Sequence, residues 1–189
     1  MKTIMRGAAV GLALALGAQA AHAQAGLSLG FGAGAVVPTG SMADVNSTGW
    51  TGQAALRVKP AVSPLGFQLD AFYTRLGLEN DLDGHSRMIG GTANAVYAFP
   101  SAAAARPYLI GGLGLYNGKT SLEGFGSTES QTKFGANAGA GFDLKLGSAA
   151  LYAEGRFHAI LKGAVNTETL DETTAYMIPI TVGLRWSLR

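Results

Sequence analysis

The chain contains no cysteine, and only 14% of its 189 residues carry a formal charge. The lack of cysteine excludes a small exported domain that depends on disulfides. The low charge would give a soluble domain only a thin polar coat. The basic residues form no stripe, so a nucleic-acid interface is not indicated. After the first twenty-odd residues, no segment is long and apolar enough to be a transmembrane helix.

The first 23 residues have the three parts of a secretory signal peptide. Lys2 and Arg6 supply a positive start, residues 7–18 form a short apolar stretch, and Ala21-His22-Ala23 offers a cleavage site. The apolar stretch falls short of the roughly 20 residues that span a bilayer. We therefore predict an exported protein, with a signal peptide over residues 1–23 and one domain over residues 24–189. Loss of the two signal cations leaves the mature chain near neutral.

Apolar and polar residues alternate along eight segments of the chain. The last segment places Ile180 and Val182 on one face, and Thr181 and Arg185 on the other. A period of two residues is typical of a β-strand with one apolar face, and no helical period is present between the segments. The sequence therefore predicts an all-β fold. Its strands are expected at Leu27–Val37, Trp50–Lys59, Leu65–Leu78, Arg87–Phe99, Pro107–Asn117, Thr132–Leu146, Ala150–Leu161 and Tyr176–Leu188.

The connections between these segments are long and short in turn. Polar, mostly long connections follow the first, third, fifth and seventh segments, at residues 40–48, 79–84, 118–131 and 162–175. Shorter connections with few acids follow the others, at residues 60–64, 100–106 and 147–149. In a meander of antiparallel strands the two sets lie at opposite ends. Transmembrane barrels show this asymmetry, with long external loops and tight periplasmic turns.

The apolar faces could point into a soluble barrel or out into lipid. Three features favour lipid: the low charge with 28 glycines, apolar faces rich in alanine, and Tyr and Trp near strand ends, where membrane interfaces recruit them. These aromatic residues are Trp50, Tyr73, Tyr97, Tyr108, Tyr116, Tyr152, Tyr176 and Trp186. We predict an eight-stranded antiparallel up-and-down transmembrane β-barrel. The alternative is a soluble exported barrel or sandwich with a ligand-binding core.

The C-terminal segment matches the signal with which outer-membrane barrels end. Thr181, Gly183, Trp186 and Leu188 supply its polar, glycine, aromatic and hydrophobic positions, although Arg189 follows where the family usually ends in an aromatic residue. With this signal and its strand pattern, the chain resembles the small eight-stranded outer-membrane barrels of Gram-negative bacteria, similar to OmpA and OmpX. The resemblance implies a location in the outer membrane among lipid and lipopolysaccharide. It also implies recognition by the barrel assembly machinery.

The lumen of an eight-stranded barrel is just wide enough to be filled by its own side chains. Charges enclosed there must pair or keep water. We expect Glu154 to pair with Arg185 or Arg156, and Asp70 to pair with Arg57. A network that fills the lumen is favoured over a gated ion path. The predicted inward polar set is Gln53, Arg57, Asp70, Lys133, Asp143, Lys145, Glu154, Arg156, His158 and Arg185.

Most acidic residues lie in the connections predicted to be external. They are Asp44, Glu79, Asp81, Asp83, Glu123, Glu129, Glu168, Asp171 and Glu172. Such loops could bind divalent cations, bridge lipopolysaccharide or meet an extracellular partner, while ordinary solvated acids are the favoured interpretation. The Asp81-Leu82-Asp83-Gly84 stretch hints at calcium but lacks the other ligand positions of an EF-hand.

Enzyme signatures are weak. The three histidines, at positions 22, 85 and 158, have no metal-ligand spacing. Barrel lipid A deacylases use a His-x-Ser pair, whereas Ile160 follows His158 at that spacing. Gly118-Lys119-Thr120 lacks the first glycine of a phosphate-binding loop. We predict no catalytic, cofactor or metal site. The predicted function is structural or surface-interacting, through acidic loops; a narrow pore or transporter for small solutes or hydrophobic molecules is the alternative, and a lipid-modifying enzyme a third class.

Overall fold

The computed structural model describes residues 26–78, 84–101, 103–122, 126–127, 130–164 and 175–188. The predicted signal peptide over residues 1–23 lies outside these ranges. Within them, no helix is long and apolar enough to cross a membrane. The regular helical structure they contain is one 3₁₀ turn, η1 (Gly40–Met42).

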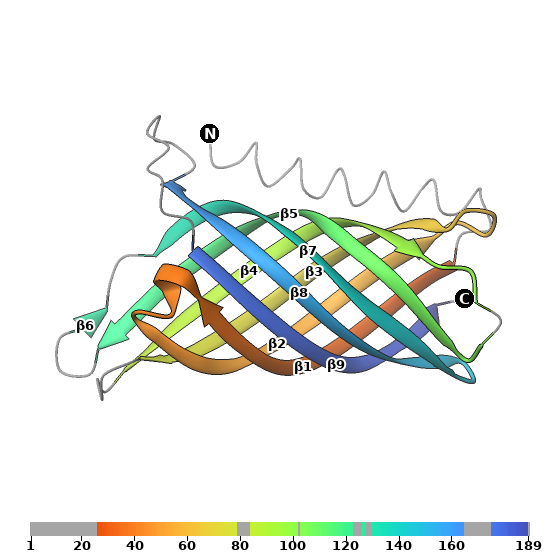
Figure 1. Ribbon diagram of the computed structural model, residues 1–189, viewed down its shortest axis with the longest axis horizontal. Coiled ribbons are helices and arrows are strands. Elements are labelled where there is room, and N and C mark those ends of the chain that lie inside the picture. Colours follow the sequence, from red (N-terminus) through yellow and green to blue (C-terminus); the bar gives the residue numbers. More distant parts are fainter. Residues whose placement is uncertain are drawn as a thin grey trace.

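The described strands form one antiparallel sheet that closes into a barrel (Figure 1). The strands are β1 (Gly26–Thr39), β2 (Asn46–Lys59), β3 (Leu65–Leu78), β4 (Gly84–Ala98), β5 (Ala105–Leu122), β6 (Gly126–Ser127), β7 (Gln131–Leu146), β8 (Ala149–Ala164) and β9 (Ala175–Leu188). Each long strand pairs with the next long strand in sequence. The barrel is closed by β1 and β9, which pair from Leu27↔Leu188 to Thr39↔Tyr176. The predicted eight-stranded up-and-down barrel is confirmed, with β6 as a short addition.

The strands extend further toward the long loops than the sequence indicates. Strand β5 continues past Asn117 to Leu122, and its last residues pair with β4 and with the two-residue strand β6. This part of β5 is polar, so its sequence looks like a loop. Backbone pairing needs no apolar face, so the ladder continues where the alternation has ended. We call this end of the barrel, with η1 and β6, the loop end, and the opposite end the turn end (Figure 1).

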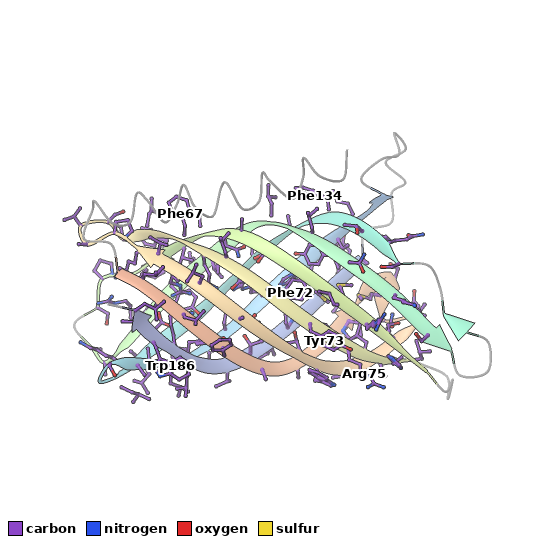
Figure 2. The ribbon with its side chains drawn as sticks, turned by 180° about the vertical axis from the view of Figure 1, so that it is seen from behind. Phe67, Phe72, Tyr73, Arg75, Phe134 and Trp186 are labelled. Atoms are coloured by element: carbon purple, nitrogen blue, oxygen red, sulfur yellow. The ribbon has the colours of Figure 1, made fainter. Side chains whose placement is uncertain are left out.

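The apolar faces point outward and the polar faces inward. Large apolar residues such as Phe31, Phe67 and Ile180 are about half exposed, whereas Asp70 and Glu154 are almost fully buried. Figure 2 shows Phe67, Phe134 and Trp186 on the outer wall and Phe72 within the barrel. An apolar outer wall over a polar interior is the arrangement of a transmembrane barrel. A soluble barrel would have the reverse arrangement.

Three tyrosines were wrongly predicted to lie at the membrane interface. Tyr108, Tyr116 and Tyr152 are at most 1% exposed and point into the lumen. They lie near strand ends, but the face of a strand is set by the two-residue alternation and not by distance from the end. Trp50 does lie on the outer wall, where its ring is 5.5 Å from that of Tyr73.

Glycines make room for these rings in the narrow lumen. A Cβ atom at position 141 would lie 2.6 Å from the Tyr108 hydroxyl, and one at position 183 would lie 2.7 Å from the Tyr152 ring. Both distances are too short for real contacts. The abundance of glycine on the inward faces therefore allows large polar aromatic side chains to cross the barrel.

Candidate functional site in the barrel lumen

An ion-pair group crosses the middle of the lumen. Arg156 on β8 donates through Nη1 to Oδ2 of Asp70 on β3, at 2.8 Å, and through Nε to Oε1 of Glu154, at 2.6 Å. All three side chains are at most 4% exposed. One guanidinium thus bridges two carboxylates that have almost no access to bulk water.

Neutral donors complete the shell around Asp70. Gln68 donates to Oδ1 at 2.7 Å, while Thr92 and Asn94 donate to Oδ2 at 3.0 and 2.7 Å. Asn137, on β7 beyond β5, donates to the amide oxygen of Asn94 on β4 at 2.9 Å. The carboxylate is therefore held by strands β3, β4 and β8 together, as a buried charge requires.

The predicted pairing of Asp70 with Arg57 is wrong. Gln68 is the cross-strand partner of Arg57 and lies between the two charges: it accepts from Arg57 Nε at 2.6 Å and donates to Asp70. Asp70 instead meets Arg156 from across the lumen. For Glu154, which was expected to pair with Arg185 or Arg156, the structure shows Arg156 as the partner.

A second ion-pair group lies toward the turn end. Asp143 on β7 accepts from Arg57 Nη1 at 3.0 Å and also from Arg185 Nη1 on β9. Each arginine covers a buried tyrosine ring: Arg57 lies 4.3 Å above Tyr108, and Arg185 lies 4.6 Å above Tyr152. Cation–π contact offsets part of the desolvation of the two guanidinium groups.

The two groups are connected. Tyr108 donates to Oε2 of Glu154 at 2.9 Å, and Arg57 Nη2 lies 4.0 Å from the same oxygen. Of the nine charged or titratable residues predicted to face inward, all except Lys133, Lys145 and His158 take part in these ion pairs. Lys145 is exposed at the turn-end mouth.

Toward the loop end the lumen becomes apolar, which the sequence analysis missed. His158 is buried, and its Nδ1 is hydrogen-bonded to the Tyr116 hydroxyl at 2.9 Å. Above it lies a cluster of buried apolar side chains. Its members are Val36, Phe72, Leu76, Tyr116, Ile160 and Met177. The available signal was the presence of large apolar residues, such as Leu76, Ile160 and Met177, at inward positions of the strands.

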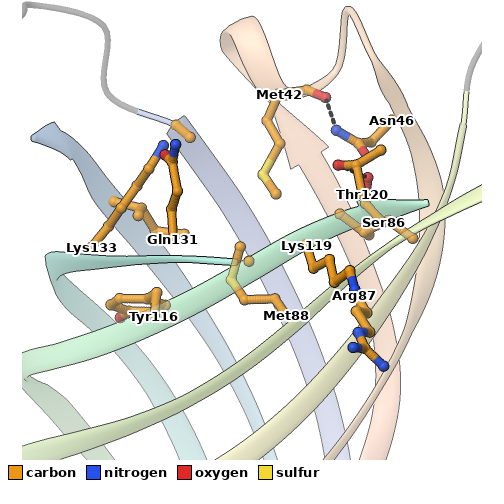
Figure 3. A pocket seen from close by; sticks show the side chains of 14 residues that line it. Met42, Asn46, Ser86, Arg87, Met88, Tyr116, Lys119, Thr120, Gln131 and Lys133 are labelled. Atoms are coloured by element: carbon orange, nitrogen blue, oxygen red, sulfur yellow. Dashed lines mark hydrogen bonds between the residues drawn. The ribbon is translucent and has the colours of Figure 1, made fainter. Parts of the chain in front are cut away.

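Each end of the lumen opens into a cavity. The loop-end cavity, of about 320 Å³, has Met42, Met88, Tyr116 and Lys133 among its lining residues (Figure 3). The turn-end cavity, of about 340 Å³, has Lys59, Arg106, Lys145 and both arginines of the second group in its lining. The two linings share no residue, and neither includes Asp70, Glu154 or Arg156. The central ion-pair group therefore lies between the two cavities.

The predicted assembly signal divides between the two faces of β9. Thr181 is buried and its hydroxyl accepts from Gln53 at 3.3 Å. Gly183 adjoins the Tyr152 ring inside the barrel. Trp186 and Leu188 are exposed on the outer wall. The signal residues thus occupy normal inward and outward positions of a barrel strand.

Neutral residues supply much of the lumen network and were largely absent from the sequence prediction. Gln53 was predicted to face inward, and it donates to the Tyr152 hydroxyl at 3.2 Å. The predicted inward set leaves out Gln68, Thr92, Asn94, Tyr108, Tyr116, Asn137 and Tyr152, which are buried. The two-residue alternation already places Gln68, Asn137 and Tyr152 on the polar faces of their strands, and it places the other four inward as well.

The remaining features from the sequence analysis concern metal binding, the loop acids and passage of hydrophobic molecules. Across the part of the chain that is described, no group of three His, Cys, Asp or Glu residues could hold a metal ion. The residues 81–83 of the calcium-like stretch are not described, nor are the predicted loop acids other than Asp44, which is exposed. A lateral opening between β1 and β9 would require a break in their pairing, and their register is continuous.

Comparison with known proteins places the chain in a family. Residues 7–185 match the model of the outer membrane protein beta-barrel domain, whereas no curated protein sequence matches. Neisserial surface protein A is similar in structure, with a TM-score of 0.60 and 19% identity, over 86% of this chain and 97% of that one. A major outer membrane protein of Thermus thermophilus has a TM-score of 0.60 and 12% identity, over 87% of this chain and 99% of that one.

A third similar structure is OprG, an outer membrane protein of Pseudomonas aeruginosa, with a TM-score of 0.53 and 12% identity, over 87% of this chain and 96% of that one. At such identities the structures show the common fold, while the family model covers nearly the whole chain. The outward apolar wall agrees with both findings. The chain therefore belongs to the outer membrane protein β-barrel domain family and is a protein of the outer membrane.

Proposed function

We propose that this protein is a non-conducting, non-enzymatic outer-membrane barrel that acts as a structural or surface-interacting element through its loops. The position of the central ion-pair group supports the closed lumen. Asp70, Glu154 and Arg156 lie between two cavities that share no lining residue. An ion crossing the barrel would have to displace side chains that are held by several short hydrogen bonds.

The charge balance of the lumen supports the same proposal. Three acids, Asp70, Asp143 and Glu154, stand against three paired arginines. Each carboxylate bonds at least one guanidinium, so the lumen offers little unpaired charge to attract a permeating ion. A structural network of this kind keeps six ionised groups inside a narrow barrel by mutual neutralisation.

Planar bilayer recording tests the closed lumen. The refolded wild-type barrel should give no discrete openings. The triple variant D70A/E154A/R156A, which removes the central charges together and leaves no unpaired member, should show small channel openings. The control K145A removes an exposed cation at the mouth and should stay silent. Steady conductance by the wild-type barrel would contradict the proposal and establish the narrow-pore alternative.

The proposed surface role requires the loop end to face the outside of the cell. The chain has no cysteine, so single cysteines report position without background. Asp44 adjoins η1 at the loop end, and Ser148 lies in the turn between β7 and β8; both are exposed. In intact cells a membrane-impermeant maleimide should label D44C and not S148C. Labelling of S148C alone would mean that the loops face the periplasm.

A further inference from the structure

Three basic residues form a row on the outer wall of the barrel near the loop end. Arg75 on β3 is the cross-strand partner of Arg87 on β4, and Arg87 is the partner of Lys119 on β5. Thr74 and Leu76, the chain neighbours of Arg75, are buried, so alternation directs Arg75 outward. Arg75 and Arg87 are exposed. We call these three residues the basic row.

The basic row has no acidic partner among the described residues. The ion pairs found there all belong to the lumen groups. Neighbouring strands lie about 4.8 Å apart, and like charges directly opposite each other are destabilising. A row of three adjacent cations therefore favours an anion that can contact more than one of them.

The row lies where the apolar wall ends. Arg75 pairs with Arg87 on β4 and, on the opposite side of strand β3, with Trp50 on β2. Two residues further from the loops, the outward positions in register are Tyr73, Ile89 and Asn117. The next outward positions are Ala71, Gly91 and Leu115. Toward the loop end, the outward side chains on β3, β4 and β5 thus change in three steps. The first row has small and apolar residues, the second includes a tyrosine and an asparagine, and the third is basic.

The figures agree with this placement. Figure 2 shows Tyr73 and Arg75 beside each other on the outer wall, toward the loop end, and Phe67 and Trp186 near the turn end. Figure 3 shows the Lys119 and Arg87 side chains next to each other and directed away from Met42 and Met88, which lie within the barrel. Arg87 and Lys119 also border the loop-end cavity, whereas Arg75 does not.

We propose that the basic row binds the phosphate groups of lipopolysaccharide in the outer leaflet. Arginine offers a planar fork that matches phosphate oxygens, and lysine adds a point charge. Trp50 and Tyr73 suit the membrane interface, and the apolar wall below can contact acyl chains. The assignment of the anion to the outer leaflet rests on the loop-end orientation in the proposed function. The charge and geometry of the row do not depend on that function.

Lipid A binding tests the proposal. The triple variant R75Q/R87Q/K119Q and the wild-type barrel would be refolded in a zwitterionic detergent with EDTA, which removes divalent bridges. Native mass spectrometry would then measure the affinity for diphosphoryl lipid A. Each basic residue near an anionic surface contributes roughly a fivefold factor, so the triple variant should bind about 100-fold more weakly. With dephosphorylated lipid A the two proteins should bind alike.

A matched control removes the same charge at the other end of the barrel. Lys59, Arg106 and Lys145 line the turn-end cavity, and K59Q/R106Q/K145Q should bind diphosphoryl lipid A like the wild type. Heat-modifiable gel mobility shows that each variant is folded, and relief of repulsion should make the basic-row variant no less stable. Equal binding by the basic-row variant and the wild type overturns the proposal, as does an equal loss in the control.

Two further results separate the source of the phosphate from the orientation of the barrel. Phosphatidylglycerol should bind the wild type more weakly than diphosphoryl lipid A, and equal affinity would overturn the assignment to lipopolysaccharide. The binding assay uses protein in detergent, so it does not depend on which end faces outside. Failure of cysteine labelling would contradict the orientation, whereas failure of lipid A binding would contradict the basic row.

Discussion

Replacing Arg156 by methionine should lower the free energy of unfolding by about 3–5 kcal/mol, the cost of removing one partner of a buried ion pair. Arg156 bonds both Asp70 and Glu154, and all three side chains are at most 4% exposed. Methionine preserves much of the length of the side chain but leaves two carboxylates with no guanidinium between them. Urea unfolding of the refolded barrel, followed by gel mobility and by the fluorescence of its two tryptophans, measures the change.

Two comparison variants show whether the effect comes from the unpaired charges. Lys145 faces the turn-end mouth and is exposed, so K145M should change stability by less than about 0.5 kcal/mol. Adding D70N and E154Q to R156M removes the orphaned charges and should recover part of the lost stability, as expected for coupled neighbours. If R156M and K145M are equally stable, the central ion-pair group contributes nothing to the fold.

The strands and their facing could be predicted because both follow from one local rule. Successive side chains alternate between the two faces of a strand, so an apolar face such as that of Ile180 and Val182 can be identified without any knowledge of the neighbouring strands. Strand β3 has the predicted bounds, Leu65–Leu78. Strand ends that project beyond the apolar wall, as in β5 after Asn117, lack this signal and were therefore missed.

The ion pairs could not be predicted in the same way. Asp70 on β3 meets Arg156 on β8, and these strands are not neighbours in the barrel. Such a contact depends on the stagger of the strands and on the width of the lumen, because these determine which side chains meet across the barrel. Sequence order gives only the strand neighbours. This explains why Arg57 was wrongly chosen for Asp70, while Arg156 was correctly considered for Glu154, on its own strand.

The apolar cluster at the loop end was missed for a different reason. A lumen expected to be polar gives no reason to place apolar residues inward, yet Leu76, Ile160 and Met177 are buried there. A residue walled in by a barrel needs either a polar partner or apolar neighbours. The lumen contains both in separate layers: ion pairs in the middle and apolar packing between them and the loop end.

The substitution of Trp186 and Leu188 by alanine should sharply reduce the amount of folded barrel in the outer membrane, while the protein refolded in detergent stays folded. Both side chains are exposed on the outer wall at the turn end. Among the described residues, the aromatic neighbour of Trp186 is Phe31, at 6.4 Å between ring centroids, a contact worth about 0.5–1.5 kcal/mol. Loss of assembly much larger than this cost would indicate recognition of β9. Heat-modifiable mobility in outer-membrane fractions measures assembly.

The same two residue types on another strand provide the decisive control. Trp50 and Leu56 on β2 are also exposed on the outer wall, at 52% and 37%. The variant W50A/L56A removes a similar apolar surface but leaves the end of β9 intact, so assembly in cells should be close to the wild-type level. Equal loss in the two variants would mean that an apolar outer wall is the requirement. Loss confined to W186A/L188A would identify the end of β9 as the part of the chain that the assembly machinery recognises.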